Sequence, residues 1–150
     1  MCEDEEKESI RSYVTPFRAA IDRARRDDWP GSMAMFPRKC CHHGCSMLLL
    51  YFRQLGIEGF QTYSGIDPTD EQERHQWLQK RDLVVDITAD QFPGIDNKAV
   101  VTRSSAWHDV LEGKPLCVPT DPEYDKEIWE WYRHVYEDTL ACLPDDNVPP

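Results

Sequence analysis

The 150-residue sequence lacks a long apolar run, an excess of positive charge and a basic, apolar start. Because a membrane-spanning helix needs about 20 consecutive apolar residues, the short apolar runs predict that no segment spans a bilayer. The formal net charge of −11 argues against binding to a nucleic-acid backbone and against docking on an anionic membrane. The first residues, Met-Cys-Glu-Asp-Glu-Glu-Lys-Glu, are the opposite of a secretory signal peptide.

Internal repeats and low-complexity linkers are also missing, which predicts a single domain over residues 1–150. That length suits one hydrophobic core, and 40% apolar residues exclude a wholly disordered chain. The acidic segment 1–8 and the C-terminal segment 144–150 are expected to be loose.

The six cysteines are even in number, which permits disulfides in principle. However, the sequence shows no secretion signal, and the adjacent Cys40 and Cys41 cannot easily bridge each other. Reduced thiols and a cytoplasmic location are therefore expected.

The order of periodic segments predicts an α+β fold with helices at both ends of the chain. Helical spacing runs from Ile10 to Ala24, and at Thr15-Pro16 the helix either kinks or starts anew. Residues 59–65 are expected to form a strand and residues 66–74 a loop. Further elements are a strand at 99–103, a short helix from Ser105, an edge strand at 114–118, and a helix capped by Asp121 with a core-facing aromatic stripe.

The stretch Phe36–Gly56 crowds three cysteines and two histidines into six positions and then continues as an apolar helix. Cys41, Cys45 and Leu48 recur at helical spacing, so one face of this helix is expected to be buried. The positive end of a helix stabilises a thiolate, which makes a cysteine in the first turn a candidate nucleophile.

A β-hairpin is predicted where two apolar segments flank Lys80-Arg81-Asp82. Because side chains alternate along a strand, a two-residue loop (Lys80-Arg81 or Arg81-Asp82) places Asp86 on the same face as His75 and Trp77. A cysteine at a helix start, a histidine on one strand and an aspartate on the next make up the apparatus of thiol catalysis. The histidine takes the thiol proton, the aspartate orients the imidazole, and the nucleophile's own backbone N–H can meet the oxyanion.

These residues resemble the transglutaminase-like branch of the papain-like cysteine enzymes, in particular its small bacterial and phage-borne members. The resemblance covers about half the chain and rests on these segments: Phe36-Pro37-Arg38, Cys41, Leu48-Leu49, His75-x-Trp77-Leu78, Asp86-Ile-Thr-Ala-Asp-Gln-Phe92, Val101-Thr-Arg and Trp107-His108. It implies a nucleophile helix packed on a small antiparallel sheet that carries the histidine and the acid. It also implies a Cys41-His75-Asp86 triad that acts through an acyl-thioenzyme and needs no metal or cofactor.

Within the resemblance, Lys39-Cys40 replaces the small residues that usually precede the nucleophile. Cys40 is therefore the second candidate for the nucleophile, and Cys45 is expected to be a core residue. The implied substrate is an amide of a protein or peptide, and hydrolysis or glutamine deamidation is the expected reaction.

Other residues near these segments are expected to have structural or supporting roles. His42 and His43 are interpreted as exposed residues of the first helical turn, and Asp90 as a turn or cap residue. Gln91 is a candidate hydrogen-bond donor near the site, and Trp29 a candidate lid or oxyanion donor.

Two alternatives to an enzyme remain open on the sequence. One is a zinc site built from Cys40, Cys41, His43 and Cys45, with His75 or His108 as a further candidate ligand, although no second ligand pair of the usual spacing accompanies it. The other is a catalytically inactive binding module on the same fold, favoured by the acidic surface and the aromatic C-terminal helix.

Overall fold

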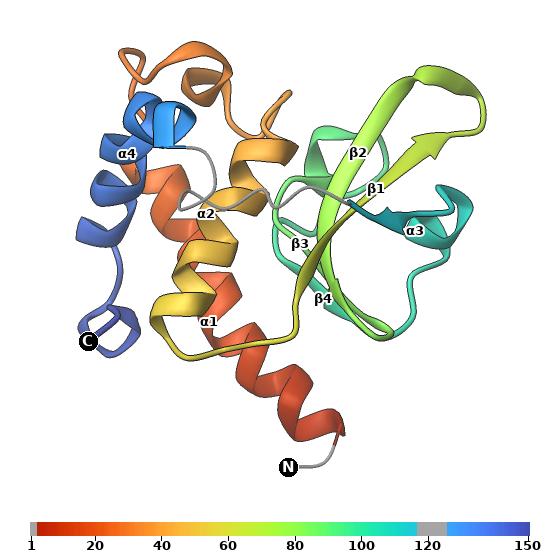
Figure 1. The fold of residues 1–150 in the computed structure, drawn as a ribbon, viewed down its shortest axis with the longest axis horizontal. Coiled ribbons are helices and arrows are strands. Elements are labelled where there is room, and N and C mark those ends of the chain that lie inside the picture. Colours follow the sequence, from red (N-terminus) through yellow and green to blue (C-terminus); the bar gives the residue numbers. More distant parts are fainter. Residues whose placement is uncertain (1–2, 117–125) are drawn as a thin grey trace.

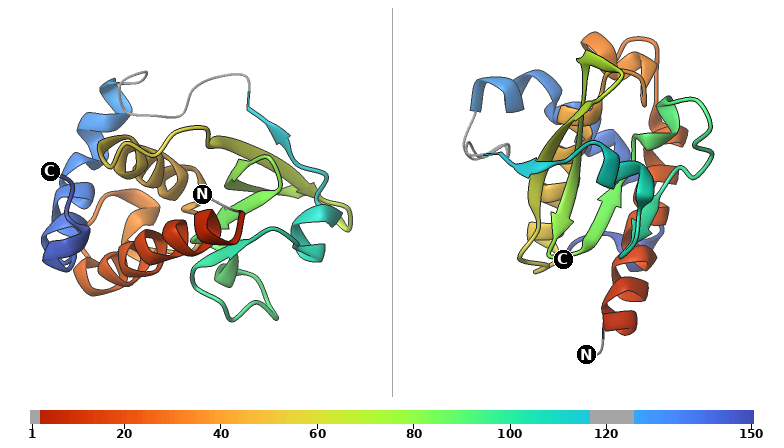
Figure 2. Two further views of the ribbon diagram at one scale, coloured as in Figure 1. Left: turned by 90° about the horizontal axis from the view of Figure 1, so that it is seen from below. Right: turned by 90° about the vertical axis from the view of Figure 1, so that its right-hand side faces the viewer.

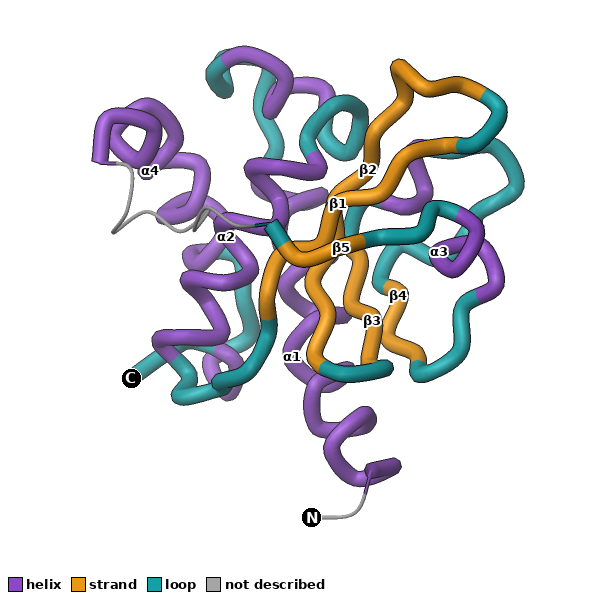
Figure 3. Tube along the Cα trace, turned by 45° about the vertical axis from the view of Figure 1, so that its right-hand side comes forward, coloured by secondary structure: helices purple, strands orange, loops and turns teal. Residues whose placement is uncertain are grey.

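In the computed structural model, which describes residues 3–116 and 126–150, three helices gather on one side of an antiparallel sheet (Figure 1). The predicted α+β class is confirmed. The sheet has five strands in the order β4-β3-β2-β1-β5, and Figure 3 shows them side by side. The helices are α1 (Glu3–Ala24), α2 (Cys41–Gln54), α3 (Ala106–Val110) and α4 (Lys126–Ala141); the strands are β1 (Gln61–Asp67), β2 (Asp70–Lys80), β3 (Leu83–Asp86), β4 (Val100–Thr102) and β5 (Lys114–Pro115).

Helix α2 packs on β2 of the sheet, while α1 lies beside it and packs on β4 and on α4 (Figure 2). The residues of α2 from Gly44 to Leu48 are all buried, so it is covered on more than the single face that the spacing predicted. Aromatic rings join it to α1, where Phe17 stacks on Tyr51 with ring centroids 4.6 Å apart. A helix that is apolar on most sides is stable only inside a core, and this burial fixes the direction in which its N-terminus points.

Helix α1 runs without a break through Pro16, so no new helix starts at Thr15. Proline has no N–H, which leaves the carbonyl four residues earlier, that of Ser12, without its helical partner. The side-chain amide of Asn147 donates to this carbonyl at 3.2 Å, and the Tyr51 hydroxyl donates to the Asn147 carbonyl at 2.6 Å. Asn147 therefore ties the C-terminal segment to α1 and α2, although most residues of 144–150 are exposed.

The acidic N-terminal segment is also ordered, because α1 begins at Glu3. Glu6 forms ion pairs with Lys80 at 2.7 Å and with Arg103 at 3.0 Å, which join the helix to β2 and to the end of β4. The hydrogen bonds from these two cations lower the pKa of the Glu6 carboxyl. The expectation of a loose acidic start at 1–8 is wrong for the residues from Glu3 onward.

Of the two hairpins in the sheet, β2–β3 was predicted from the sequence and the outer part of β1–β2 was not. Residues 66–74 are not a loop: Ile66 pairs with Arg74, so β1 and β2 continue as a polar, two-stranded extension. The β2–β3 hairpin is as predicted, with Lys80 paired to Leu83 across the two-residue loop Arg81-Asp82. The predicted strand at 99–103 and short helix after Ser105 are confirmed as β4 and α3.

The edge strand and the C-terminal helix are confirmed in part. Strand β5 pairs with β1 over Lys114 and Pro115, whereas residues 117–118 and the predicted cap Asp121 lie outside the described residues. The aromatic stripe of α4 buries Tyr132, Val135, Tyr136 and Thr139. In the part of the chain that the structure covers, no helix combines the length and apolar character needed to cross a membrane.

Candidate active site

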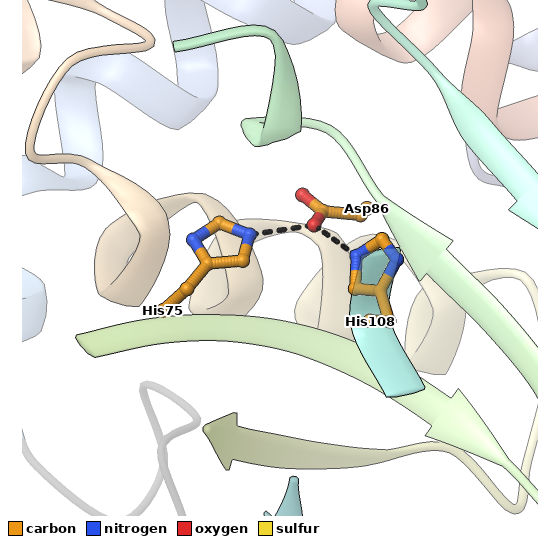
Figure 4. A group of neighbouring side chains, drawn as sticks. All are labelled: His75, Asp86 and His108. Carbon is orange, nitrogen blue, oxygen red and sulfur yellow. Dashed lines mark hydrogen bonds and ion pairs between the residues drawn. The ribbon is translucent and has the colours of Figure 1, made fainter. Parts of the chain in front are cut away.

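The β2–β3 hairpin brings His75 and Asp86 into direct contact. Since Lys80 pairs with Leu83, the register continued along the strands sets Asp86 opposite Trp77, and His75 lies two residues further on the same face. Nε2 of His75 is 2.6 Å from Oδ2 of Asp86 (Figure 4). Both side chains are buried, with 2% of each residue exposed.

Asp86 receives hydrogen bonds at both carboxylate oxygens. Oδ2 accepts from Nε2 of His75 and, at 2.7 Å, from Nε2 of His108 on α3, while Oδ1 accepts from the Thr88 N–H at 2.9 Å. Burial by itself raises the pKa of the Asp86 carboxyl. The charge of His75 and the hydrogen bonds from both histidines outweigh burial and hold that pKa well below its usual range, so Asp86 is ionised.

His75 lies in an aromatic enclosure. Its ring makes edge contacts with Phe92 and Trp107, at centroid distances of 5.0 and 5.5 Å, and stacks at 6.0 Å on Trp77. Burial lowers the pKa of His75, but the Asp86 charge, the hydrogen bond to Asp86 and the interaction with Cys41 raise it to about 9. The apolar surroundings of the His75 ring strengthen its electrostatic attraction to Asp86.

Cys41 is the first residue of α2 and is half-buried, in contrast to the fully buried His75 and Asp86. Asp86 occupies Nε2 of His75, whereas Nδ1 makes no hydrogen bond to the described residues. Cys41 is near enough to the ring to help raise its pKa. The first turn of α2 approaches the sheet closely at Gly44, where a Cβ would lie 3.3 Å from Cγ2 of Thr88. The structure thus brings together the three predicted site residues.

The other two cysteines of this turn are inside the core. Cys40 is fully buried, and its thiol donates to the carbonyls of Ser32 and Arg38 at 3.0 and 3.1 Å. Burial raises the pKa of the Cys40 thiol to about 11 and that of Cys45 well above its ordinary value. Cys40 is therefore a poor candidate nucleophile, and the expectation of Cys45 as a core residue is confirmed.

The two histidines that follow Cys41 are half-buried and make specific contacts. His42 is half-buried, with Nδ1 3.1 Å from Oε1 of Gln76 on β2. His43 lies against Trp131 and Tyr132 of α4, at centroid distances of 5.2 and 5.1 Å, and burial lowers its pKa. The two side chains tie the start of α2 to β2 and to α4, and the interpretation of exposed first-turn residues is wrong.

Asp90 is the anchor of the segment after β3 and is not a simple turn residue. Its carboxylate accepts two hydrogen bonds from the guanidinium of Arg18, at 2.6 and 2.9 Å, and Arg18 also donates to the Ile87 carbonyl at 2.7 Å. Arg18 is 3% exposed, so this pair ties α1 to the loop that follows Asp86.

Gln91 donates a hydrogen bond near the site, as expected, whereas Trp29 has a structural partner in place of the lid or oxyanion role. Gln91 accepts from the Lys39 N–H at 3.1 Å and donates to the Thr88 carbonyl at 3.0 Å, which holds the turn before α2 against the end of the sheet. Trp29 is buried, and its indole N–H donates to Asp138 at 3.0 Å. A buried, hydrogen-bonded indole does not serve as a lid.

The cysteine-rich turn does not assemble the zinc site considered above. Over residues 3–116 and 126–150, the potential ligands that gather within 4.8 Å of one another are His75, Asp86 and His108. Cys41 and Cys45 lie one turn apart on α2, but no third potential ligand joins them within that distance among the described residues. With Asp86 ionised, both Nε2 atoms are assigned as donors to its carboxylate, and a metal ion bound there would have to displace these two protons.

His108 is the site residue whose place the sequence did not reveal. The sequence pattern marks His108 as part of the family resemblance and as a candidate zinc ligand, but it does not predict the contact with Asp86. The Ser105-x-x-His108 spacing did carry a local signal, since Ser105 caps α3 by accepting from the His108 N–H.

The stability of the fold is expected to depend on the proton of His75. A histidine whose pKa is raised in the folded state contributes stability that is complete below its ordinary value of 6.5 and is lost as the pH rises through about 9. Since a tenfold change in equilibrium constant is about 1.4 kcal/mol, the loss amounts to about 3 kcal/mol. Denaturant unfolding of the wild type and of His75→Gln across this range measures it, and equal slopes for the two proteins would contradict the assignment.

We compared the chain with protein-family models, with curated proteins and with solved structures, and none matched.

Proposed function

We propose that the protein is a cysteine enzyme that carries out acyl chemistry on an amide, with Cys41 as nucleophile, His75 as base and Asp86 as the residue that orients the base. The observation that carries this proposal is the position of His75 between the buried Asp86, which it contacts through Nε2, and the half-buried Cys41, which helps raise its pKa. Nδ1 of His75 has no hydrogen-bond partner among the described residues and can face the thiol. Asp86 is buried in the core, whereas the Cys41 thiol is more accessible.

The chemistry follows from the positions of the protons. Because the pKa of His75 is raised to about 9, Nδ1 takes the proton of Cys41 before the attack, and Asp86 stabilises the imidazolium. Sγ then bonds to the substrate carbonyl carbon. When the C–N bond breaks, the imidazolium returns the proton to the leaving amine or ammonia. Water then attacks the acyl-thioenzyme, His75 accepts a proton from the water, and the thiolate leaves.

The N-terminus of α2 is suited to hold the oxyanion. Cys40 is its N-cap and makes no side-chain capping hydrogen bond to the described residues. The first N–H groups of a helix have no partner within the helix, so those of Cys41 and His42 are donors for an oxyanion beside Sγ.

The α+β architecture supports the finer family proposal. A central helix that begins with the nucleophile packs on an antiparallel sheet carrying His75 and Asp86, as expected for the transglutaminase-like branch of the papain-like enzymes. We propose a protein or peptide substrate, and hydrolysis or glutamine deamidation as the reaction. The free thiols of Cys40, Cys41, Cys45 and Cys142 favour a reducing, cytoplasmic environment.

Mass spectrometry of products formed in heavy-oxygen water tests the reaction type. Denatured casein is incubated with wild-type enzyme and, as control, with Cys41→Ala. Deamidation introduces one heavy oxygen into a glutamine side chain, proteolysis introduces one into a new C-terminus, and transfer to an added primary amine introduces none.

The same experiment separates the enzyme from a binding module. We expect wild-type products that are absent with Cys41→Ala. If neither protein yields a product and Cys41 reacts with iodoacetamide no faster than a small reference thiol, the enzyme proposal fails and the inactive module is favoured.

A further inference from the structure

We infer that His108 is a positioning residue for the proposed reaction, and that Ser105 fixes the tautomer in which it acts. The inference rests on the proposed function, because His108 has a role in the chemistry only if Asp86 and His75 serve Cys41. His108 comes from α3, 22 positions beyond Asp86, and is 4% exposed.

The geometry shows what His108 does to the carboxylate. Its Nε2 is 2.7 Å from Oδ2 of Asp86, the oxygen that also lies 2.6 Å from Nε2 of His75 (Figure 4). An aspartate carboxylate rotates readily about its last bond, and one hydrogen bond does not fix that angle. With a ring on each side of Oδ2 and the Thr88 N–H on Oδ1, the plane of the carboxylate is set before His75 is protonated.

Ser105 decides which nitrogen of His108 carries the proton. Its hydroxyl oxygen lies 2.6 Å from Nδ1 of His108 and accepts from the His108 backbone N–H at 3.2 Å. Since this oxygen already accepts from the backbone, its own hydrogen is available to Nδ1. Nδ1 is then an acceptor, and the ring proton is on Nε2, where it points at Asp86.

A neutral donor suits this position better than a cation. An arginine or lysine in place of His108 would neutralise Asp86 and so weaken its attraction for the imidazolium of His75. A neutral imidazole holds the carboxylate while leaving its full negative charge for His75. In this arrangement Ser105 orients His108, His108 orients Asp86, and Asp86 orients the His75 ring that serves Cys41.

Two substitutions at His108 separate the hydrogen bond from the volume of the side chain. His108→Gln keeps an N–H donor at similar reach, and His108→Leu keeps a comparable volume without a donor. We expect His108→Leu to slow the alkylation of Cys41 by iodoacetamide about 10- to 100-fold, because a buried charge loses a donor. His108→Gln should stay within about threefold of the wild type and keep its pH profile.

A third variant acts through Ser105. Glycine is nearly as good an N-cap as serine, so Ser105→Gly removes the hydroxyl with little effect on α3. We expect an intermediate slowing of Cys41 alkylation and a loss of the His108 Nε2 proton signal through exchange. This variant keeps the inference testable if His108→Leu does not fold.

Proton NMR supplies a readout that a merely structural role would not move. The wild type should show two strongly downfield imidazole N–H signals, one from each Nε2 bound to Asp86. His108→Gln should remove one signal and leave the other in place, whereas His108→Leu should also shift the remaining His75 signal.

The outcomes distinguish this inference from the proposed function. If wild-type Cys41 reacts like a small reference thiol, the proposed function fails first. If wild-type Cys41 is fast and a folded His108→Leu is equally fast, or His108→Gln is as slow as His108→Leu, the inference is overturned. Stoichiometric metal in the wild type that is lost in His108→Gln would also overturn it, because both histidines would then be ligands.

Discussion

Cys41→Ala is expected to abolish covalent labelling by an acyl-mimicking electrophile and to lower any amide-cleaving activity by at least about a thousandfold. The reason is that Cys41 is a half-buried thiol near His75, whose pKa it helps to raise. The fold should remain intact, because the Cys41 side chain is not part of the buried core. Peptide mapping of the labelled protein measures the effect.

Cys142→Ala is the matched control, since Cys142 is also a half-buried free thiol but lies at the far end of the chain. Its labelling pattern at Cys41 should equal that of the wild type. Persistent labelling of Cys41→Ala at Cys40 would refute the choice of nucleophile. We do not expect it, because Cys40 is buried and its pKa is raised to about 11.

Asp86→Asn is expected to slow Cys41 chemistry by about 10²- to 10⁴-fold, even though asparagine has nearly the same shape. Asp86 accepts from two imidazoles at Oδ2 and from Thr88 at Oδ1. An amide has one oxygen and one NH2, so either orientation sets the NH2 against an N–H donor. The charge that raises the pKa of His75 is lost as well.

The same substitution should lower the free energy of unfolding at neutral pH by about 1–3 kcal/mol, the range for a buried donor left without its acceptor. Asp109→Asn is the matched control, because Asp109 is exposed on α3 and next to His108 in the sequence. Denaturant unfolding and the alkylation rate of Cys41 are measured on both variants. An Asp86→Asn protein with wild-type stability and wild-type rate would remove Asp86 from the site.

Local rules were sufficient for the part of the site that lies within one hairpin. A two-residue loop and the alternation of side chains along a strand set His75 and Asp86 on one face, and the structure shows this contact. Helical spacing likewise placed Cys41 in the first turn of α2. In both cases the information is contained in residues close together in the sequence.

Local rules failed wherever a distant segment completes an interaction. The alternative of a new helix start at Thr15 fails because α1 continues through Pro16, and Asn147 donates to the carbonyl that Pro16 leaves without its helical partner. Residues 66–74 were expected to form a loop because they are polar, yet pairing with each other lets them continue as strands. Polarity reports exposure to water, and exposed strands are also polar on both faces.

The sequence by itself determined the fold class, the β2–β3 hairpin with its histidine–aspartate pair, and the helix that begins at Cys41. Tertiary structure alone decided which thiol meets His75, because only the burial of α2 in the core turns Cys40 inward. It also decided that His43 is covered by α4 and that His108 meets Asp86. Periodicity fixes which face of an element is apolar, whereas the neighbour of that face depends on packing over the whole chain.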